Sequence, residues 1–332
     1  MTALAQSAPA PYALQQLHDH LAVDMAGVNA TILEYLQSDI ALIPQVGEYL
    51  IRAGGKRLRP LLTVASARLC GDTSDLSHAL AAAVEFIHSA SLLHDDVVDE
   101  SAQRRGQPSA NDAFGNQTSV LVGDFLFARS FELMVKTGDI KILDILSKAA
   151  ATITEGEVLQ LSLAGNITTT DGDYFRVIGA KTAALFSAAT ECGAILGGRP
   201  EQQPHLRDYG YHLGMAFQLI DDLLDYNGGP DLNKNIGDDL REGKLTLPVI
   251  LAIRAGDSEE KDFWQTALSG EADHTMFARA HSLMVKHRVF DAVRTEAQKQ
   301  ANLAKAALGH TAPHPLRDLL IALLDDVIER RK

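Results

Sequence analysis

The sequence predicts an all-α fold, and three observations lead to this prediction. Apolar residues recur at positions i, i+3, i+4 and i+7 in segments too long to be strands, which span residues 13–37, 76–98, 140–164, 173–196 and 205–226. The breaks between such segments are short and rich in Gly and Pro, which is typical of turns between helices. No alternation of apolar and polar residues is long enough to indicate a strand. We therefore expect a bundle of ten or more helices around a central active-site cavity.

The order of the elements indicates one domain. Residues 1–12 are rich in Ala, Pro and Ser and are expected to form a flexible arm. Residues 13–332 show no linker-like change in composition, so they are expected to form a single domain. Residues 76–98 are apolar on nearly every side, which places this helix at the centre of the bundle.

Composition excludes several classes of function. The chain has 332 residues, of which 22% are charged, and a formal net charge of −13. We expect no nucleic-acid partner, because binding to a phosphate backbone needs a basic surface. Cys70 and Cys192 provide neither a disulfide framework nor the spacing of a zinc site. No apolar run reaches the length of a transmembrane helix, and the first Lys or Arg is Arg52, so we expect a cytoplasmic protein without a signal segment.

Two copies of the pattern Asp-Asp-x-x-Asp carry most of the functional information. They consist of Asp95, Asp96 and Asp99, and of Asp221, Asp222 and Asp225. Each copy lies in an apolar helical segment, where residues four apart share a face and uncompensated like charges destabilise the helix. Carboxylates are hard ligands suited to Mg²⁺, and water and phosphate oxygens complete its coordination. The two motifs predict a metal-bound polyphosphate in a cavity between their helices.

Two clusters of basic residues are placed to bind phosphate. Residues 54–60, Gly-Gly-Lys-Arg-Leu-Arg-Pro, present Lys56 and Arg59 on a turn before a helix, and their spacing is not that of a Walker loop. Taken alone, this cluster is equally consistent with a solvated turn. Arg104 and Arg105 follow the first acidic motif directly, and guanidinium groups bind phosphate oxygens in pairs.

Further polar residues accompany the helices that carry the acids. Lys181 and Thr182 fall in mid-helix, where a lysine often extends to the surface. Lys234 and Lys244 follow the second acidic motif, and Lys244 is predicted at a helix start, which favours an anion.

Two histidines and a glutamine have both structural and functional interpretations. His88 lies close to one helix face with Asp95 and is placed to donate to a phosphate, whereas His94 is interpreted as a core histidine. Gln218 lies one turn before Asp222 and is consistent with either role.

These motifs, in this order, resemble those of the trans-isoprenyl diphosphate synthases. The matching stretches are Gly-Gly-Lys-Arg-Leu-Arg-Pro, the first acidic motif with Arg-Arg-Gly, Lys-Thr-Ala, Phe-Gln-Leu-Ile-Asp-Asp-x-x-Asp, and Gly-Asp-Asp-Leu-Arg-Glu-Gly-Lys-x-Thr-Leu-Pro. They run from about residue 49 to residue 248 and are most similar to the long-chain branch, such as octaprenyl, solanesyl or decaprenyl diphosphate synthases. The resemblance implies Mg²⁺-dependent head-to-tail condensation of isopentenyl diphosphate with an allylic diphosphate, farnesyl or geranylgeranyl diphosphate being expected. It also implies an all-α fold that forms a homodimer.

The resemblance assigns a role to each matching residue. The ligands of about three Mg²⁺ ions would be Asp95, Asp99 and Asp221, supported by Asp96, Asp222 and Asp225. The allylic diphosphate would contact Arg104, Lys181, Thr182, Gln218, Lys234 and Lys244, of which Arg104, Lys181 and Lys244 would act in catalysis by stabilising the leaving group. Isopentenyl diphosphate would be held by Lys56, Arg59, His88 and Arg105.

The residues upstream of Asp95 bear on product length. Ala90 and Ser91 lie five and four positions before it, and neither is the aromatic residue with which short-chain relatives stop elongation. We therefore expect a product well beyond fifteen carbons. The resemblance to the long-chain branch implies about forty to fifty carbons and use as a quinone side chain. Phe86 either closes the tunnel after one more turn or points into the bundle. The opposite wall is expected to include Val158 and Leu161.

Three rival functions are a shorter geranylgeranyl-type synthase, a terpene cyclase, and a non-catalytic partner subunit of another synthase. A cyclase has no need of the cluster predicted to bind a second diphosphate. Intact acidic motifs argue against the partner subunit.

Overall fold

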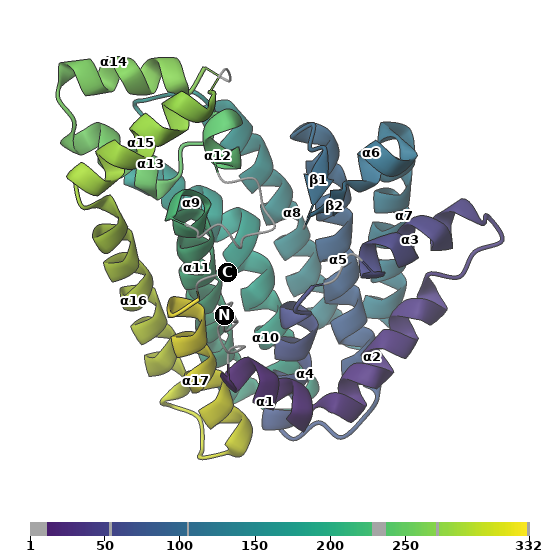
Figure 1. The fold of residues 1–332 in the computed structure, drawn as a ribbon. Coiled ribbons are helices and arrows are strands. Elements are labelled where there is room, and N and C mark those ends of the chain that lie inside the picture. The colour runs from purple at the N-terminus through teal and green to yellow at the C-terminus, as the bar shows by residue number, and fades with distance from the viewer. Residues whose placement is uncertain (1–11, 53–54, 105, 228–236, 270–271, 331–332) are drawn as a thin grey trace, which may run out of the picture.

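The structure is a computed structural model that describes residues 12–52, 55–104, 106–227, 237–269 and 272–330, and nearly all of these residues are helical (Figure 1). The first half contains α1 (Tyr12–His20), α2 (Ala22–Tyr35), α3 (Leu42–Arg52), α4 (Leu58–Leu69), α5 (Leu76–Val98), β1 (Gln103–Arg104), β2 (Gln107–Pro108), α6 (Ala110–Phe114), α7 (Asn116–Lys136) and α8 (Ile140–Leu163). The second half contains α9 (Asp171–Ile178), the π-helical turn η1 (Gly179–Ala183), α10 (Ala184–Leu196), the 3-10 turn η2 (Pro200–Gln202), α11 (Gln203–Asn227), α12 (Asp238–Arg241), α13 (Leu247–Ala255), α14 (Ser258–Ala267), α15 (His274–Lys286), α16 (Val289–Leu308) and α17 (Pro315–Ile328).

Helix α10 joins the two sides of the bundle. It packs against α4, α5 and α8 on one side and against α11 on the other. In Figure 1, α2, α3, α5 and α7 form one side of the molecule, whereas α11 and α13 to α17 form the other. The two long helices that carry the acidic motifs, α5 and α11, are therefore held apart by a shared neighbour.

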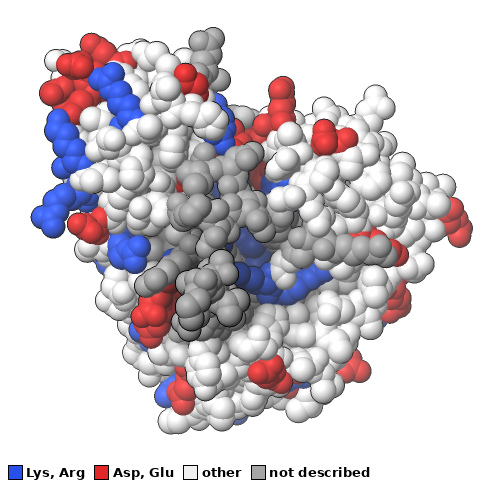
Figure 2. All heavy atoms as spheres, viewed as in Figure 1, with Lys and Arg blue, Asp and Glu red and all other residues white. Residues whose placement is uncertain are grey.

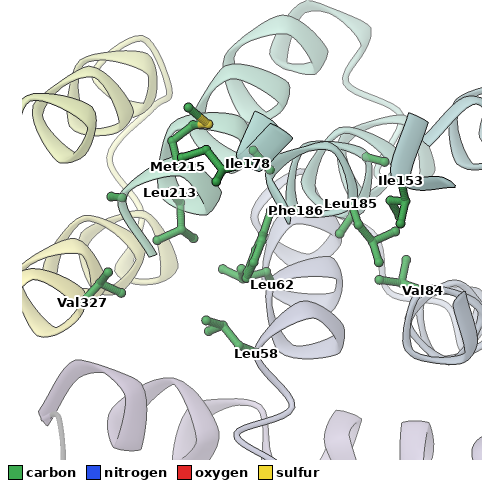
Figure 3. Close-up of a cluster of buried hydrophobic side chains, with 14 of the residues drawn as sticks. Leu58, Leu62, Val84, Ile153, Ile178, Leu185, Phe186, Leu213, Met215 and Val327 are labelled. Atoms are coloured by element: carbon green, nitrogen blue, oxygen red, sulfur yellow. The ribbon is translucent and has the colours of Figure 1, made fainter. Parts of the chain in front are cut away.

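The core around α10 consists of interlocking aliphatic and aromatic side chains. Figure 3 shows Leu185 of α10 pointing toward Ile153 of α8 and Val84 of α5, while Phe186 points toward Leu62 of α4. All five side chains are almost fully buried. Close-packed interiors transmit small displacements, so these residues help to fix the position of α10 relative to α4, α5 and α8.

The predicted helical fold is confirmed, with differences at three elements. The segment 13–37 is divided at Leu21 into α1 and α2, so that α1 can pack against α17 while α2 packs against α5. The segment 173–196 is interrupted by η1. A short antiparallel hairpin, in which Gln103 pairs with Pro108, was not predicted because each strand has only two residues.

Two boundary predictions also need comment. Tyr12, assigned to the flexible arm, is the first residue of α1, and residues 1–11 lie outside the described residues. Among the described residues, α5 is the one helix long and apolar enough to cross a membrane, contrary to the sequence-based expectation of none. Most of that helix is buried in the bundle, as expected for a central core helix.

Candidate active site

The two acidic motifs lie at the carboxyl ends of their helices. Asp99 is the C-terminal capping residue of α5, and Asp225 is two residues from the end of α11. Carboxylates at this end of a helix are disfavoured by the helix dipole. Cations must therefore compensate for them.

Cationic side chains from other elements contact three of the acids. Lys181 Nζ of η1 lies 4.0 Å from Asp95 Oδ2, and Lys244 Nζ donates to Asp99 Oδ2 at 2.9 Å. Arg330, beyond the end of α17, pairs with Asp221 at 3.2 Å. These contacts bring α5, η1, α11 and the C-terminal segment to one site. Arg330 was missed by the sequence analysis, because its separation from the motifs gave no local signal.

Burial opposes ionisation of the first of these acids. The side chain of Asp95 is only 15% exposed, and burial raises its pKa to about 7, with Glu157 and Asp99 adding to the rise and Lys181 opposing it. Lys181 Nζ also lies 2.6 Å from Glu157 Oε1. The single charge of Lys181 is therefore shared between Asp95 and Glu157, and binding of a further cation would reduce the repulsion between these two carboxylates.

Lys244 is held in a similarly acidic environment. Burial lowers its pKa, but the surrounding carboxylates of Asp239, Glu242 and Asp99 outweigh this effect, so that the pKa lies above its ordinary value. The prediction that Lys244 begins a helix was wrong. It lies in the turn between α12 and α13, because α13 begins only at Leu247, one residue before Pro248.

Asp96 and Asp222 are placed differently from the other acids. Asp96 is fully buried, and its Oδ1 accepts hydrogen bonds from Arg104 Nε at 2.7 Å and NH2 at 2.6 Å. Asp222 is 5% exposed, accepting from Tyr174 Oη at 2.7 Å and Gln218 Nε2 at 2.6 Å. Asp96 follows Asp95, and Asp222 follows Asp221, so each is rotated about 100° around its helix from the preceding acid. Asp96 and Asp222 are therefore more buried than the acids beside them, and their role in metal binding, which the resemblance gives as support of the other ligands, stays a prediction.

Polar residues of α4 and α5 form a second group. Lys56, Arg59 and His88 line a cavity of about 390 Å³, and Arg104 and Arg330 lie on the same cavity. Arg59 NH1 lies 3.2 Å from His88 Nε2, and its guanidinium stacks 4.3 Å above the Phe186 ring. The expected isopentenyl diphosphate residues are thus brought together. Arg104 was assigned to the allylic substrate, but the structure places it with this second group.

The loop that carries Lys56 is fixed by its neighbour. Arg57 has a left-handed backbone, with φ of 45°, and its NH1 pairs with Glu85 Oε1 of α5 at 2.6 Å. Arg57 therefore anchors the turn to α5 at the wall of the cavity that Lys56 also lines. Burial lowers the pKa of Lys56, and the nearby Arg330 adds to this effect. Figure 2 shows Lys and Arg side chains gathered at the floor of the hollow between the two sides of the molecule.

The π-helical turn presents the third group, Lys181 and Thr182. Thr182 Oγ1 donates to Gln218 Oε1 of α11 at 2.8 Å. The turn lies against α8 at Gly156, where a Cβ atom would come within 2.8 Å of Ala180 Cβ and 2.9 Å of Lys181 N. Only glycine permits this approach. The extra residue in a π turn rotates the side chains that follow the turn. The sequence pattern did not reveal this π turn.

Several predicted residues need separate mention. Arg105 and Lys234 lie outside the described residues. His94 Nε2 lies 3.2 Å from Val120 O and 3.5 Å from Asp124 Oδ1, which supports its structural interpretation, although the side chain is 38% exposed.

The chain-length residues occupy different faces of α5. Ala90 is buried, and Ser91 is half-buried, with its Oγ donating to His88 O. Phe86 lies nine residues before Asp95, which at about 100° per residue places it on the opposite side of the helix. It is 2% exposed and points into the bundle. Phe86 therefore does not lie on the face of α5 that carries Ser91.

The expected opposite wall was wrong. Val158 and Leu161 are 61% and 55% exposed and lie on the outer face of α8. The two residues are three positions apart, on one face of α8, and this face is exposed to solvent, so they do not line the interior of the protomer.

The chemistry of the site suits a metal held jointly with a substrate. Among the described residues, no three His, Cys, Asp or Glu side chains are close enough to hold a metal ion by themselves. Mg²⁺ is commonly held by one or two carboxylates, with phosphates and water completing its coordination. The outward acids Asp95, Asp99, Asp221 and Asp225 fit that arrangement, since each pair comes from one helix and leaves positions for diphosphate oxygens.

Comparison with known proteins agrees with this geometry. The sequence profile of the family described as polyprenyl synthetase matches residues 40–284. The chain belongs to the polyprenyl synthetase family. It is 46% identical to the octaprenyl diphosphate synthase of Escherichia coli over 96% of this chain and 99% of that protein. Membership and this similarity make the chain a prenyltransferase that synthesises long-chain all-trans polyprenyl diphosphates.

Solved structures extend the comparison to the fold. A polyprenyl synthase from Caulobacter crescentus, complexed with calcium and isoprenyl diphosphate, is 48% identical with a TM-score of 0.93, covering 98% of this chain and 100% of that one. A decaprenyl diphosphate synthase from Rhodobacter capsulatus is 52% identical with a TM-score of 0.91, covering 96% and 99%. The helical arrangement described above is therefore that of the polyprenyl synthases.

Proposed function

We propose that the chain condenses isopentenyl diphosphate with an allylic diphosphate, farnesyl or geranylgeranyl diphosphate, and repeats this step to a product of about forty to fifty carbons. The observation that carries the proposal is the separation of the basic residues into two neighbouring groups, which Arg330 joins because it pairs with Asp221 and lines the cavity of the second group. Lys181 and Lys244 stand beside the outward acids, whereas Lys56, Arg59 and His88 form the other group. Two diphosphates can thus be held at once, as a condensation requires.

The metal we propose is Mg²⁺, with about three ions per site, as the motif resemblance implies, and it would be required for binding of the allylic diphosphate. When bound, it would supply charge stabilisation to the leaving diphosphate. The residues that would hold it are Asp95, Asp99, Asp221 and Asp225. The Caulobacter crescentus relative, which is complexed with calcium and isoprenyl diphosphate, supports the binding of a divalent cation.

The side chains have separate tasks in this reaction. Lys181 and Lys244 would bind the allylic diphosphate and stabilise the negative charge that develops on it as the carbon–oxygen bond breaks. Lys56, Arg59 and His88 would hold isopentenyl diphosphate with its double bond toward the resulting allylic cation. The double bond then forms the new carbon–carbon bond, and the proton lost from the adjacent carbon passes to the released diphosphate. Buried apolar side chains around Ala90 would exclude water from the cation.

The metal-site assignment can be tested with one variant and a matched control. Asp95→Ala should lower the incorporation of labelled isopentenyl diphosphate by at least about a hundredfold, because it removes a group that acts on developing charge. Asp291→Ala, on an exposed acid of α16 that pairs only with Arg288 in the same stretch, should retain full activity. Unchanged activity of purified Asp95→Ala would favour the non-catalytic partner subunit instead.

We further propose a homodimer formed through α7 and α8. Val120, Leu121 and Val135 of α7 and Val158 and Leu161 of α8 are all more than a third exposed, and the two helices are neighbours. Exposed apolar residues gathered on one face are typical of a protein interface. Light scattering of the purified chain should give twice the mass of 35.8 kDa, and a monomer would contradict the assignment.

A cytoplasmic location and a quinone side chain as the destination of the product complete the proposal. In the part of the chain that the structure describes, the one helix apolar enough to span a membrane is mostly buried in the bundle. Quinone analysis of cells in which the chain replaces their own synthase would test the destination, since the side-chain length should follow this enzyme.

A further inference from the structure

Tyr174 makes a buried contact with the second acidic motif. Its Oη donates to Asp222 Oδ2 at 2.7 Å, and the two side chains come from α9 and α11. Tyr174 is 3% exposed. Helix α9, which carries Tyr174, begins with a capping box, in which Thr170 and Asp173 satisfy each other's backbone N–H groups and fix the start of the helix.

The hydrogen bonds that follow have a fixed direction. Asp222 accepts from Tyr174 at Oδ2 and from Gln218 Nε2 at Oδ1, the latter at 2.6 Å, so the amide nitrogen of Gln218 is turned toward Asp222. The amide oxygen of Gln218 then faces Thr182, whose hydroxyl donates to it at 2.8 Å. The series therefore runs from Tyr174 through Asp222 and Gln218 to Thr182, which adjoins Lys181 on the cavity wall.

Tyr174 is well suited to act as the fixed donor of this series. Burial raises its pKa well above the ordinary value, and the neighbouring Asp222 adds to the rise, so the hydroxyl keeps its proton. Both oxygens of Asp222 are engaged, and it is 5% exposed. Loss of either donor would leave a buried acceptor unsatisfied, and the carboxylate would move or take up a proton.

We propose that Tyr174 is a positioning residue for the allylic site, which acts through Asp222 to fix the amide orientation of Gln218 and the direction of the Thr182 hydroxyl. The proposal rests on the proposed function, because Thr182 and Gln218 matter only if an allylic diphosphate binds beside them. It also gives Asp222 a role other than the metal ligation predicted from sequence. The group that holds isopentenyl diphosphate has no member in this series.

This separation of the two substrates makes the proposal measurable. With Tyr174→Phe, the KM for the allylic diphosphate should rise about tenfold, as expected for loss of a hydrogen bond to a buried charged group. The KM for isopentenyl diphosphate should change by less than about twofold. A purely structural role would lower the melting temperature but would not divide the two KM values.

Tyr209→Phe is the matched control. Tyr209 is also a fully buried tyrosine, but its Oη donates to Leu320 O of α17 at 2.9 Å, on the side of α11 away from the cavity. It should lose stability to a similar degree and keep both KM values. Activity of the unchanged chain and of this control tests the proposed function separately from the role of Tyr174.

A second variant keeps the test decisive if Tyr174→Phe folds poorly. Asp222→Asn retains the size of the side chain but can present an N–H group to Gln218, which removes the fixed direction. Asp222→Asn should raise the KM for the allylic diphosphate selectively. The double variant Tyr174→Phe/Asp222→Asn should have an allylic KM no higher than that of Asp222→Asn alone. Equal KM values for Tyr174→Phe and Tyr209→Phe, or a purely additive double variant, would overturn the proposal.

Discussion

Replacing Ser91 with phenylalanine should shorten the product of this enzyme. Ser91 lies four residues before Asp95, about 6 Å along α5 and about 40° around it, so its side chain and the metal-binding face point in nearly the same direction. It is half-buried, with its hydroxyl bonded to His88 O. An aromatic ring there would stand in the path of the growing chain.

The size of the effect follows from the geometry of α5. Ser91 is little more than one helical turn of about 5.4 Å from the acid, which leaves room for a short isoprenoid tail only. We expect products of about twenty carbons or fewer. Overpacking should cost about 1–3 kcal/mol in the free energy of unfolding, so the variant should remain folded and active.

Phe86→Ala provides the opposite control. Phe86 lies on the far side of α5 from Asp95 and is 2% exposed, so its loss should cost about 3–5 kcal/mol in stability without lengthening the product. The assay is extension of farnesyl diphosphate with labelled isopentenyl diphosphate, followed by dephosphorylation and chromatography. Longer products from Phe86→Ala together with unchanged products from Ser91→Phe would refute the proposed path of the tail.

Three further predictions concern residues that support the site or the fold. Arg330→Ala should raise the KM for isopentenyl diphosphate about tenfold, because a cation is lost from the cavity wall; steady-state kinetics with an unchanged KM would contradict this. Gly156→Ala should destabilise the protein by about 1–3 kcal/mol in thermal or urea unfolding and raise the allylic KM, since the new Cβ would press on the turn that carries Lys181; a neutral effect on both would show that the contact is not restrictive. Hydrogen bonds from Lys286 and His287 lower the pKa of Glu260 to about 2, so its contribution to stability is complete above about pH 4.5 and is lost as the pH falls toward 2. Glu260→Gln should therefore lower the melting temperature at pH 7 but much less at pH 3. Glu259→Gln, at an 86% exposed side chain, should leave the melting temperature unchanged at both pH values. A loss of melting temperature in Glu260→Gln that persists in full at pH 2 would contradict the assignment.

Periodicity allowed the long helices to be predicted from the sequence, because a 3.6-residue apolar repeat over twenty residues has no competing interpretation. The predicted segment 76–98 coincides with α5. The π turn at Lys181 was not predictable in this way, since its cause is the close approach of Gly156 from a different helix. The same holds for the placement of Lys244, which depends on where α13 begins.

Some site residues could be predicted from the sequence, whereas others depend on contacts between distant segments. The acids and bases could be named from their motifs, but a motif does not say which side of a helix faces the cavity. Asp96 and Asp222 belong to the motifs and yet are buried, with Asp96 Oδ1 engaged by Arg104 and both oxygens of Asp222 engaged by Tyr174 and Gln218. Contacts between distant segments decide such assignments, so Tyr174 and Arg330 became visible only in the structure.

The central claim is that two diphosphates are held on one cavity with the aid of a divalent metal and joined repeatedly into a long chain. The most direct measurement incubates the purified protein with farnesyl diphosphate, labelled isopentenyl diphosphate and Mg²⁺, with EDTA in a parallel reaction, and sizes the dephosphorylated products by chromatography. We predict metal-dependent products of about forty carbons or more. Products that stop at about twenty carbons would contradict the open path along α5, and no incorporation from any allylic diphosphate would contradict the assignment of the site.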